Sequence, residues 1–393
     1  MSAHSLIPPS SAAIWGSPDG CTGWVLMSQQ YPDDESGEEA LEGEASHEIG
    51  AELIGSATRG PTLTGPDHFV GKQAANGIIF TEEMYDGALI YANDVARVMR
   101  DRAIFGGRGF GTEKRLIMPQ IHEQSFGTTD QFIYDSIKRE LFIWDYKFGY
   151  IIYEAFENWQ MINYIAGIIK LLELDGIDEQ NITVHIRVIQ PRAHHRDGII
   201  REWVVKLSDL RGYFNILNAK AHEALGPNPI LHTGSHCRFC SARHACAPAL
   251  QAGVGLYEVA AKPVPLELSP LSLGVQLLII KRAIKQLEYL ESAYMERVKV
   301  TIKKGTLVPN WNMEHGRGKL AWNKPANEII ALGNLLGFDL KKPDAVKTPT
   351  QAKSLGIDDA VINAYSDKPR TGLMLVPDNG SKARKFFGDN NND

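Results

Sequence analysis

This 393-residue chain has no long apolar run, no excess of basic over acidic residues, and only four cysteines. No stretch of 18 apolar residues occurs, and the first residues lack the basic and apolar segments of a signal peptide, so we expect a cytoplasmic protein without membrane spans. The net charge of -6 excludes a uniformly basic nucleic-acid coat, so any nucleic-acid contact must use a local patch. The composition, 44% hydrophobic and 22% charged, is typical of one elaborated globular domain or two ordinary ones.

The most informative stretch runs from residue 127 to residue 164. Residues 141–145 form a short apolar run of bulky side chains, typical of a buried strand, and the run ends in Asp145, with Lys147 two places later. Residues two apart share one face of a strand, so both polar heads can reach one point. Asp130 closes the segment before it, and the turn-like residues 135–136 predict a β-hairpin. We therefore expect the two aspartates side by side on neighbouring strands.

Adjacent carboxylates raise each other's pKa and cost stability unless a cation lies between them. Oxygen ligands suit Mg²⁺ or Mn²⁺, and a nearby lysine can activate or orient a metal-bound water. The residues alone therefore predict a divalent-metal site at Asp130 and Asp145, with Lys147 beside it.

In this order and spacing, Asp130, Asp145 and Lys147 resemble the signature of the PD-(D/E)xK nuclease superfamily. Apolar spacing predicts a helix over residues 154–174. Gln160 and Tyr164, four apart on this helix, resemble the QxxxY motif of the RecB and λ-exonuclease branch. Any one of these patterns is weak alone, but their order and spacing together are specific.

Two residues upstream extend this resemblance. The segment 43–47, which ends in His47, resembles the GxxxH motif of the same branch, and Glu113 lies in a strand-like segment where that branch carries another acidic residue. The resemblance implies a mixed central sheet flanked by helices, that is, an α/β, restriction-endonuclease-like core. It also implies that His47 and Glu113 join the two aspartates as metal ligands, and that the QxxxY residues help to position the metal or the DNA end.

The four cysteines form a second pattern. Cys237, Cys240 and Cys246 lie close together in sequence, whereas Cys21 lies more than 200 residues upstream. In a reducing compartment such a cluster indicates a metal rather than a disulfide, and both zinc and [4Fe-4S] accept four thiolates. Three histidines lie in the same segment, so a zinc site with one histidine ligand remains an alternative: His232, His236 and His244.

The cysteine spacing resembles the iron-sulfur staple of AddB and of the CRISPR adaptation nucleases. That resemblance implies a [4Fe-4S] cluster held by Cys21, Cys237, Cys240 and Cys246, which would tie the N-terminal segment to the end of the nuclease core. A crosslink that closes so long a loop is expected to stabilise the fold.

The chain changes character after the cysteines. We expect residues 1–260 to form the nuclease core, and residues 261–393 to form a C-terminal helical extension, with one long helix over 271–304. Trp15, Cys21 and the segment 309–311 also resemble an uncharacterised phage-encoded family within the superfamily. Arginines and histidines between Arg192 and Arg201 make the best local patch for a DNA backbone.

These patterns together predict a Mg²⁺- or Mn²⁺-dependent DNA exonuclease that acts in phage recombination or replication. Its expected partners are DNA and a phage single-strand annealing or replication protein. Two alternatives stay open: a non-catalytic DNA-binding module that retains the nuclease fold, and an endonuclease of DNA acquisition or defence.

Overall fold

The computed structural model describes residues 5–31, 37–60, 63–174, 179–260, 269–317, 321–341, 348–349, 352, 356–367 and 370–377. The chain divides into two compact units, Met1–Glu291 and Ser292–Asp393. The first unit contains the α/β core, and each unit is described by itself below. The sequence predicted that the nuclease core ends at residue 260, whereas the two compact units divide after Glu291. The end of the core at residue 260 therefore stays a prediction.

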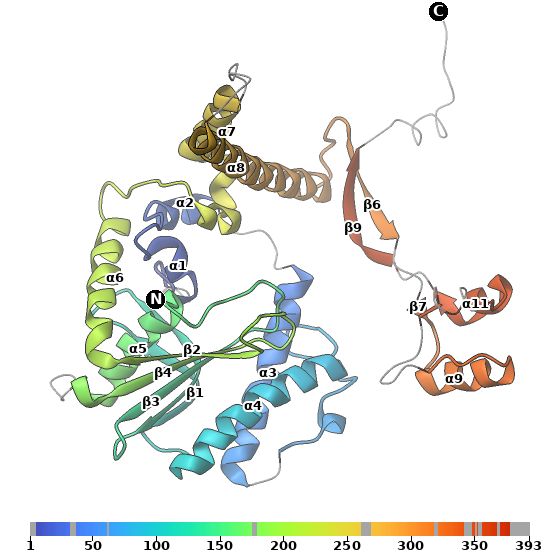
Figure 1. The fold of residues 1–393 in the computed structure, drawn as a ribbon, viewed down its shortest axis with the longest axis horizontal. Coiled ribbons are helices and arrows are strands. Elements are labelled where there is room, and N and C mark those ends of the chain that lie inside the picture. Colours follow the sequence, from blue (N-terminus) through green and yellow to red (C-terminus); the bar gives the residue numbers. More distant parts are fainter. Residues whose placement is uncertain are drawn as a thin grey trace, which may run out of the picture. The chain divides into compact units, whose positions relative to one another are not determined.

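A five-stranded sheet with the order β1-β2-β3-β4-β5 forms the centre of the first unit (Figure 1). Neighbouring strands are antiparallel except for β3 and β4, which run parallel, so the sheet is mixed as predicted. The strands are β1 (Phe110–Ile117), β2 (Phe126–Asp135), β3 (Glu140–Tyr146), β4 (Thr183–Ile189) and β5 (Ile200–Lys206).

The predicted hairpin joins β2 to β3. The Asp135 carboxylate accepts hydrogen bonds from the backbone N–H groups of Ile137 and Lys138, which closes a tight turn. Gln131 pairs with Trp144 in the resulting register. One further step along this register sets residue 130 opposite residue 145, so the two aspartates lie on neighbouring strands as expected.

Helix α5 (Trp159–Leu172) connects the parallel strands β3 and β4. It begins at Trp159 and not at Glu154, where the apolar spacing predicted its start. The reason is local: the Asn158 side chain accepts the backbone N–H of Met161 and caps the helix, and Glu157 has a left-handed backbone with φ 51°. This start places Gln160 in the first turn, close to the end of β3.

Helices cover both faces of the sheet. On one face, α3 (Glu38–Arg59) and α4 (Glu82–Arg102) pack against each other and against buried Phe142, Trp144 and Tyr146. On the other face, α1 (Ala12–Trp15), α5 and α6 (Arg211–Ala224) enclose an aliphatic core that includes Ile143 and Ile186. Alternate residues of β3 therefore point into two different cores.

The N-terminal segment docks onto the chain that follows α6. The backbone N–H of Gly23 donates to Ile230 (2.9 Å), the Ile230 N–H donates to the Thr22 hydroxyl (3.0 Å), and Ser241 donates to the Tyr31 carbonyl (2.5 Å). The elements in these two segments are η1 (Pro9–Ser11), α2 (Trp24–Gln30), η5 (Ser235–Phe239), η6 (Ser241–His244) and α7 (Ala247–Ala260). Three further 3-10 turns are η2 (Pro66–His68), η3 (Glu179–Asn181) and η4 (Leu207–Leu210).

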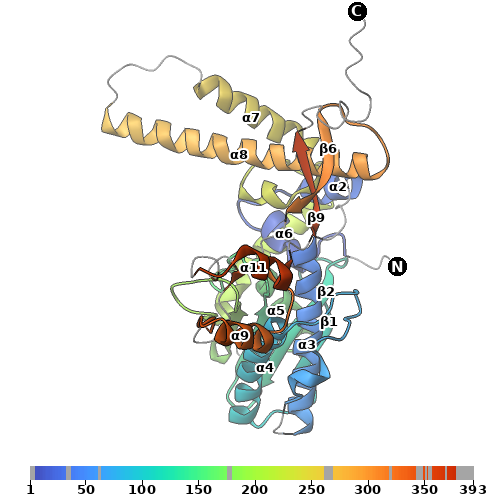
Figure 2. The ribbon, with the colours of Figure 1, turned by 90° about the vertical axis from the view of Figure 1, so that its right-hand side faces the viewer.

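Helix α8 (Pro270–Lys303) is the longest described helix (Figure 2) and matches the predicted span within one residue at each end. The predicted C-terminal helical extension is confirmed, but it also carries two small sheets that the sequence did not indicate, β6-β9 and β7-β8. Its elements are β6 (Trp311–Arg317), β7 (Ala321–Trp322), α9 (Ala326–Leu335), α11 (Asp359–Tyr365), β8 (Ser366–Asp367) and β9 (Arg370–Pro377). Within the described ranges, every helix is too short or too polar to cross a lipid bilayer.

Candidate metal centre

Three adjacent strands and one helix bring four acidic or imidazole side chains to one end of the sheet. β1 carries Glu113, β2 carries Asp130 and β3 carries Asp145 next to its last residue, while α3 carries His47. The strand order makes the three carboxylates neighbours, although they are separated in sequence. The sheet therefore concentrates negative charge at the position that the sequence predicted.

Glu113 has an unusual backbone. Its φ is 43°, in the left-handed region that a strand residue other than glycine rarely adopts, while its neighbours Thr112 and Lys114 pair regularly with β2. Such a conformation costs of the order of 1–3 kcal/mol and persists where the surrounding structure holds it. Here it accompanies a Glu113 side chain that faces His47 and not the sheet surface.

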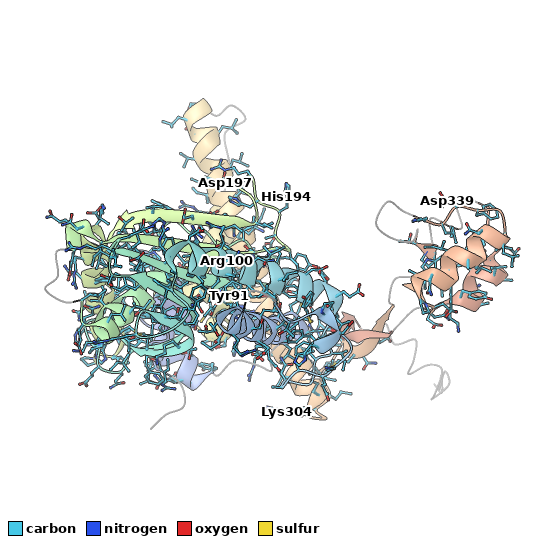
Figure 3. All side chains as sticks on the ribbon, turned by 90° about the horizontal axis from the view of Figure 1, so that it is seen from below. Tyr91, Arg100, His194, Asp197, Lys304 and Asp339 are labelled. Atoms are coloured by element: carbon cyan, nitrogen blue, oxygen red, sulfur yellow. The ribbon has the colours of Figure 1, made fainter. Side chains whose placement is uncertain are left out.

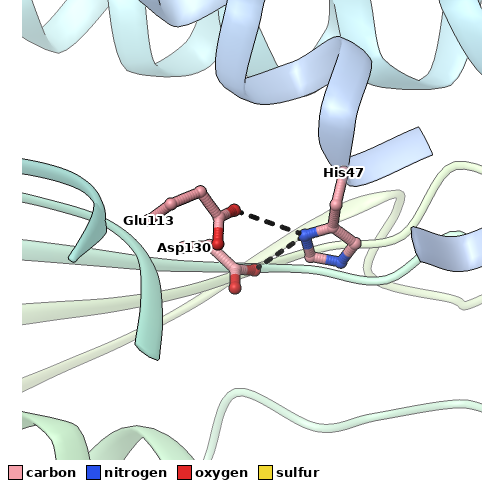
Figure 4. A group of neighbouring side chains, drawn as sticks. All are labelled: His47, Glu113 and Asp130. Atoms are coloured by element: carbon pink, nitrogen blue, oxygen red, sulfur yellow. Dashed lines mark ion pairs between the residues drawn. The ribbon is translucent and has the colours of Figure 1, made fainter. Parts of the chain in front are cut away.

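His47, Glu113 and Asp130, which we call the His47 triad, converge (Figure 4). His47 Nδ1 lies 3.8 Å from Glu113 Oε1 and 3.7 Å from Asp130 Oδ2. Across the described part of the chain, these three side chains form the group whose possible ligand atoms all lie within 4.8 Å of one another. One nitrogen and two carboxylates fit a divalent cation such as Mn²⁺ or Mg²⁺.

The charges of the triad act on its histidine. Burial opposes the charged imidazolium, but the charge of Asp130 and the hydrogen bond to Glu113 outweigh this effect and raise the pKa of His47. A bound cation would take the place of that proton, because a metal-ligating imidazole must be neutral. The triad therefore attracts positive charge, whether a proton or a metal supplies it.

Asp145 lies outside the triad and belongs to a neighbouring polar group. Its Oδ1 accepts hydrogen bonds from Lys147 Nζ (2.9 Å) and from the Gln160 side-chain amide (3.0 Å). Lys147 also approaches Gln160 Oε1 at 3.4 Å. Three of the predicted catalytic residues thus contact one another directly, and Asp130 joins β3 by accepting the Tyr146 backbone N–H (2.8 Å).

The second carboxylate oxygen of Asp145, Oδ2, is buried and has no hydrogen-bond partner among the described residues. Burial raises the pKa of Asp145, and the charge of Asp130 adds to this shift while Lys147 opposes it. For Lys147, burial opposes the charge, but Asp145 and Asp130 outweigh it and raise its pKa. A buried carboxylate oxygen without a partner is costly, and a cation is the ligand that would satisfy it.

Two buried tyrosines, Tyr164 and Tyr91, experience the charge of the acidic residues. Burial raises the pKa of Tyr164 far above its usual range, and the charges of Asp130 and Asp145 add to this shift. Tyr91 on α4 experiences burial and the same acidic field, which raise its pKa as well. It lies inside the packed unit (Figure 3), and its ring stacks on Tyr146 with centroids 5.0 Å apart.

Tyr91 and Tyr146 are supporting residues that sequence reasoning missed. The Tyr146 ring lies 5.2 Å from the His47 ring, and its hydroxyl lies 2.7 Å from the Ser46 hydroxyl. Strand alternation could have assigned Tyr146 to the α3 side, because it lies between Asp145 and Lys147. Tyr91 carried no signal, since it occurs in an ordinary apolar helix face.

A groove of about 860 Å³ opens from the triad along α3. Its walls are the outward face of α3 and the segment from η2 to Phe80, with Lys72 and His68 among the lining residues. Carboxylates are frequent along it: Glu44, Glu48, Glu52 and Glu113. Two of these hold the opposite wall, because Glu48 accepts the Ala75 backbone N–H and Glu44 accepts the Asn76 side-chain amide.

The structure engages part of the basic cluster after β4, which the sequence suggested as a DNA patch, in contacts within the unit. Arg192 donates to Glu42 and Glu83 and lies 3.8 Å over the Phe148 ring, so it fastens its loop to α3 and α4. Arg201 is buried and donates to Tyr153 and Gln190. Arg196, whose side chain is 89% exposed, and exposed His194 are the members on which the patch continues to rest as a prediction. His194 and Asp197 remain on the edge of the unit (Figure 3).

All four cysteines line one small cavity, together with His232 and His236. No disulfide joins them. Backbone N–H groups of His232 and Gly234 donate to Cys21 Sγ and Cys237 Sγ, each at 3.4 Å. Burial raises the pKa of the Cys21 and Cys237 thiols, and that of Cys240 to about 11, so without a cation these thiols stay protonated.

The cysteine sulfurs do not form a compact group. Within the described ranges, no three of them lie within 4.8 Å of one another, in contrast to the His47 triad. A tetrahedral zinc site with Zn–S bonds of ~2.3 Å needs sulfurs ~3.8 Å apart. The fold thus gathers the four thiols around one cavity, at spacings wider than a zinc site requires.

Comparisons with known proteins give one match. The family model described as "Protein of unknown function (DUF2800)" matches residues 4–364. No curated protein and no solved structure matches the chain.

Proposed function

The chain belongs to the DUF2800 family, and because this description assigns no activity, we propose a function from the site itself: metal-dependent hydrolysis of DNA phosphodiester bonds. The observation that carries the proposal is the surplus of carboxylate at one end of the sheet. The His47 triad gathers two carboxylates around an imidazole, and beside it a buried Asp145 oxygen has no partner. Such an arrangement favours the binding of a cation.

The donor set fits Mg²⁺ or Mn²⁺. His47, Glu113, Asp130 and Asp145 would hold the ion, and the three carboxylates match the preference of these ions for oxygen. When bound, the ion lowers the pKa of a ligated water and offsets charge on the scissile phosphate.

The remaining residues orient the attacking water, the neighbouring side chains and the DNA end. Lys147, whose charged form Asp145 stabilises, orients the attacking water by donating a hydrogen bond to it. Gln160 donates to Asp145 and accepts from Lys147, so it fixes both heads in one geometry. Tyr164, kept neutral by burial, offers a hydroxyl to the DNA end.

An exposed aromatic loop beside Lys147 supports a nucleic acid as the substrate. Tyr153 lies 5.3 Å from Lys147 Nζ, and Tyr150 and Phe156 are 58% and 63% exposed on the same loop. The loop backbone is held by buried Gln190, which donates to the Gly149 and Ile151 carbonyls. Fixed, exposed rings provide surfaces on which bases can stack.

The resemblance to the RecB and λ-exonuclease branch makes exonucleolytic digestion from DNA ends the proposed mode. A role in phage recombination or replication, beside a single-strand annealing or replication protein in the host cytoplasm, completes the proposal.

The direct test uses end-labelled linear DNA with Mg²⁺ or Mn²⁺. The wild type should shorten the DNA progressively, and Asp145→Ala should not, while Asp86→Asn, an exposed carboxylate change on α4, should cleave normally. A closed circular substrate run in parallel should remain intact; its cleavage would reveal an endonuclease. If the wild type binds DNA but degrades neither substrate, the chain is a binding module.

For the cysteine cavity we propose a [4Fe-4S] cluster, with zinc as the alternative. Support comes from the four cysteines around one cavity, from the two N–H groups that donate to sulfur, and from spacings wider than a tetrahedral zinc site needs. The site joins Cys21 to residues more than 200 positions later, so the metal would crosslink the N-terminal segment to the core.

Anaerobic purification tests this proposal. A brown protein that absorbs at about 400 nm and contains iron supports the cluster, and the Cys240→Ser variant should lack this absorption band. Colourless protein with one bound zinc per chain would establish the alternative. Protein without either metal would contradict both.

A further inference from the structure

The segment that follows β3, residues 149–156, presents a concentration of large apolar side chains to solvent; we call it the aromatic loop. Its exposed apolar residues are each between 37% and 63% exposed: Tyr150, Ile151, Ile152, Tyr153 and Phe156. Scattered single apolar residues are normal on a protein surface, whereas a contiguous group marks a place where a ligand or partner binds. The aromatic loop is therefore a candidate interaction site.

Buried polar side chains fix the backbone of the aromatic loop. Gln190, which is fully buried, donates to the Gly149 and Ile151 carbonyls and accepts the Tyr153 backbone N–H at 3.3 Å. Arg201, which is also buried, donates to the Tyr153 carbonyl at 2.6 Å and to the Gln190 side chain at 2.7 Å. The exposed side chains are thus placed before any ligand arrives, so little conformational entropy is lost on binding.

The aromatic loop borders the metal centre, and this position limits what can occupy it. Lys147 Nζ lies 5.3 Å from the centroid of the Tyr153 ring. Further along the loop, His195 Nε2 lies 3.2 Å from Glu154 Oε1, and Arg196, the next residue after this histidine, has a side chain that is 89% exposed. A ligand held at Lys147 therefore lies beside an aromatic ring, and a cation for its phosphates follows the contact to Glu154.

Further rings support the far end of the aromatic loop. The Phe156 ring lies edge-on to Trp203 of β5 with centroids 5.2 Å apart, and Trp203 lies 6.0 Å from Tyr213 of α6. Trp159, the first residue of α5, lies 5.4 Å from Tyr213. These three supporting rings are partly buried and pack on the core, whereas Phe156 itself is 63% exposed. Phe156 is therefore held by its neighbours while much of its own ring stays open to solvent.

Exposed, fixed rings discriminate between unpaired and paired nucleic acid. In a duplex the bases stack on one another, and a protein reaches only their edges in the grooves. In an unpaired strand the face of each base is free to stack on tyrosine or phenylalanine. Such stacking accepts every base, because every base has a π-face.

We propose that the aromatic loop is a base-stacking element that binds an unpaired DNA strand beside the metal centre, with Tyr150, Tyr153 and Phe156 as its stacking residues. This inference rests on the proposed function, because a DNA strand is expected beside Lys147 only if the centre binds DNA. It adds the form of the substrate, an unpaired strand, and the residues that select it.

Fluorescence anisotropy in EDTA tests the proposal with labelled probes. They are a thymidine strand of about 15 nucleotides, the same backbone without bases, and a blunt duplex of equal length; the wild type should bind the thymidine strand at least about tenfold more tightly than either other probe. Phe156→Ala and Tyr150→Ala should each weaken binding of the thymidine strand about tenfold and leave binding of the abasic strand unchanged. Ile137→Ala, a change at a residue 93% exposed in the turn between β2 and β3, is the matched control and should bind as the wild type does.

A second variant guards against a folding defect. Phe156→Leu keeps an apolar side chain against Trp203 and removes only the ring, so it should melt at the temperature of the wild type and still lose most of the preference for bases. Equal binding of the thymidine and abasic strands by the wild type would overturn the proposal, as would Phe156→Ala and Tyr150→Ala variants that bind as the wild type does.

These measurements use no metal and no cleavage, so they separate the two proposals. Protein that prefers the thymidine strand through these rings but degrades no DNA would refute hydrolysis and support base stacking. Protein that degrades linear DNA but binds the thymidine and abasic strands equally would refute base stacking and leave hydrolysis in place.

Discussion

Two clusters of charged residues lie on opposite faces of β3, and they differ in one respect that separates structural from functional charge. On the α4 face, Asp94 accepts hydrogen bonds from Trp144 (2.8 Å), Arg187 (2.9 Å) and Arg97 (2.8 Å). Arg187 also donates to Glu202 (2.7 Å). We call this group the Asp94 network. On the α5 face, one residue further along the strand, Asp145 has a buried oxygen without a partner.

The ionisation of the two clusters follows this difference. Burial opposes ionisation of Asp94, but hydrogen bonds from Trp144 and Arg97 and the charge of Arg187 outweigh it and lower its pKa. Burial raises the pKa of Asp145 because its cationic partner does not compensate fully. Buried charge by itself is therefore no sign of a functional site. Buried charge without a full set of partners is a better sign, because it lowers stability unless a ligand such as a metal ion compensates it.

The largest expected effect is on the rate of DNA cleavage and follows from a change at Asp130 in the metal centre. Asp130→Asn should reduce DNA cleavage about 1,000-fold, which corresponds to ~4 kcal/mol of lost transition-state stabilisation. Without metal, the variant should be as stable as the wild type or more stable by up to ~1 kcal/mol, because a like charge beside Asp145 is gone and the amide oxygen still accepts from Tyr146. Cleavage rates and urea unfolding in EDTA measure the two effects. A large loss of stability would make Asp130 a structural residue.

The matching change on the other face is Asp94→Ala. It should lower the free energy of unfolding by about 3–5 kcal/mol, because Arg187 keeps its charge in a buried position and Trp144 loses its acceptor. Urea unfolding followed by tryptophan fluorescence checks this value. A loss below about 1 kcal/mol would show that the hydrogen bonds and ion pairs of Asp94 do not stabilise the fold as described.

Metal binding should sharpen the contrast between the two clusters. At a Mn²⁺ concentration 100 times Kd, the wild type should gain ~2.7 kcal/mol of stability, because the ion binds the folded state alone. Asp130→Asn should gain little, whereas Glu202→Gln, in the Asp94 network, should gain as much as the wild type. Thermal melts with and without Mn²⁺ provide the measurement. Equal gains in all three proteins would refute a site at the triad.

Acidification should lower the free energy of unfolding through Glu202 of the Asp94 network, by less than the substitution Asp94→Ala does. The hydrogen bond from His185 and the charge of Arg187 lower the pKa of Glu202 to about 2. A lowered folded-state pKa stabilises the protein above the ordinary value near 4.5, and this contribution is lost as the pH falls from about 4.5 to about 2. With a side chain one-third exposed, the contribution should be ~1–2 kcal/mol after solvent screening. Glu202→Gln should flatten the decline of unfolding free energy between pH 5 and pH 3; identical slopes would refute this assignment.

Much of the fold could be predicted from local patterns. The apolar run at residues 141–145 indicated a buried strand with a polar exit, the turn at residues 135–136 indicated the hairpin, and apolar spacing indicated α8 within one residue at each end. The start of α5 was predicted too early, because apolar spacing does not register an Asn158 cap. Periodicity identifies which face is apolar, while side-chain caps decide where an element begins.

The candidate site was predictable in its membership and not in its geometry. The sequence indicated His47, Glu113 and the two aspartates, and the fold brings the first two and Asp130 within 4.8 Å of one another. It separates Asp145 into the group with Lys147 and Gln160, which spacing could not reveal. Spacing also could not reveal that Arg192 of the basic cluster pairs with Glu42 on α3 and Glu83 on α4.

By itself, the sequence determined which residues lie on which face of each element, where charge was placed against the apolar pattern, and where thiols were close in the chain. These properties depend on the period of a strand or helix, which is local. Tertiary packing decided which charges are matched. It neutralised Arg187 and Arg192, gave Glu113 a strained backbone beside His47, brought Cys21 to the distant cysteines, and left one Asp145 oxygen without a partner. The strength of a charge depends on the groups around it, and those come from elements far apart in the chain.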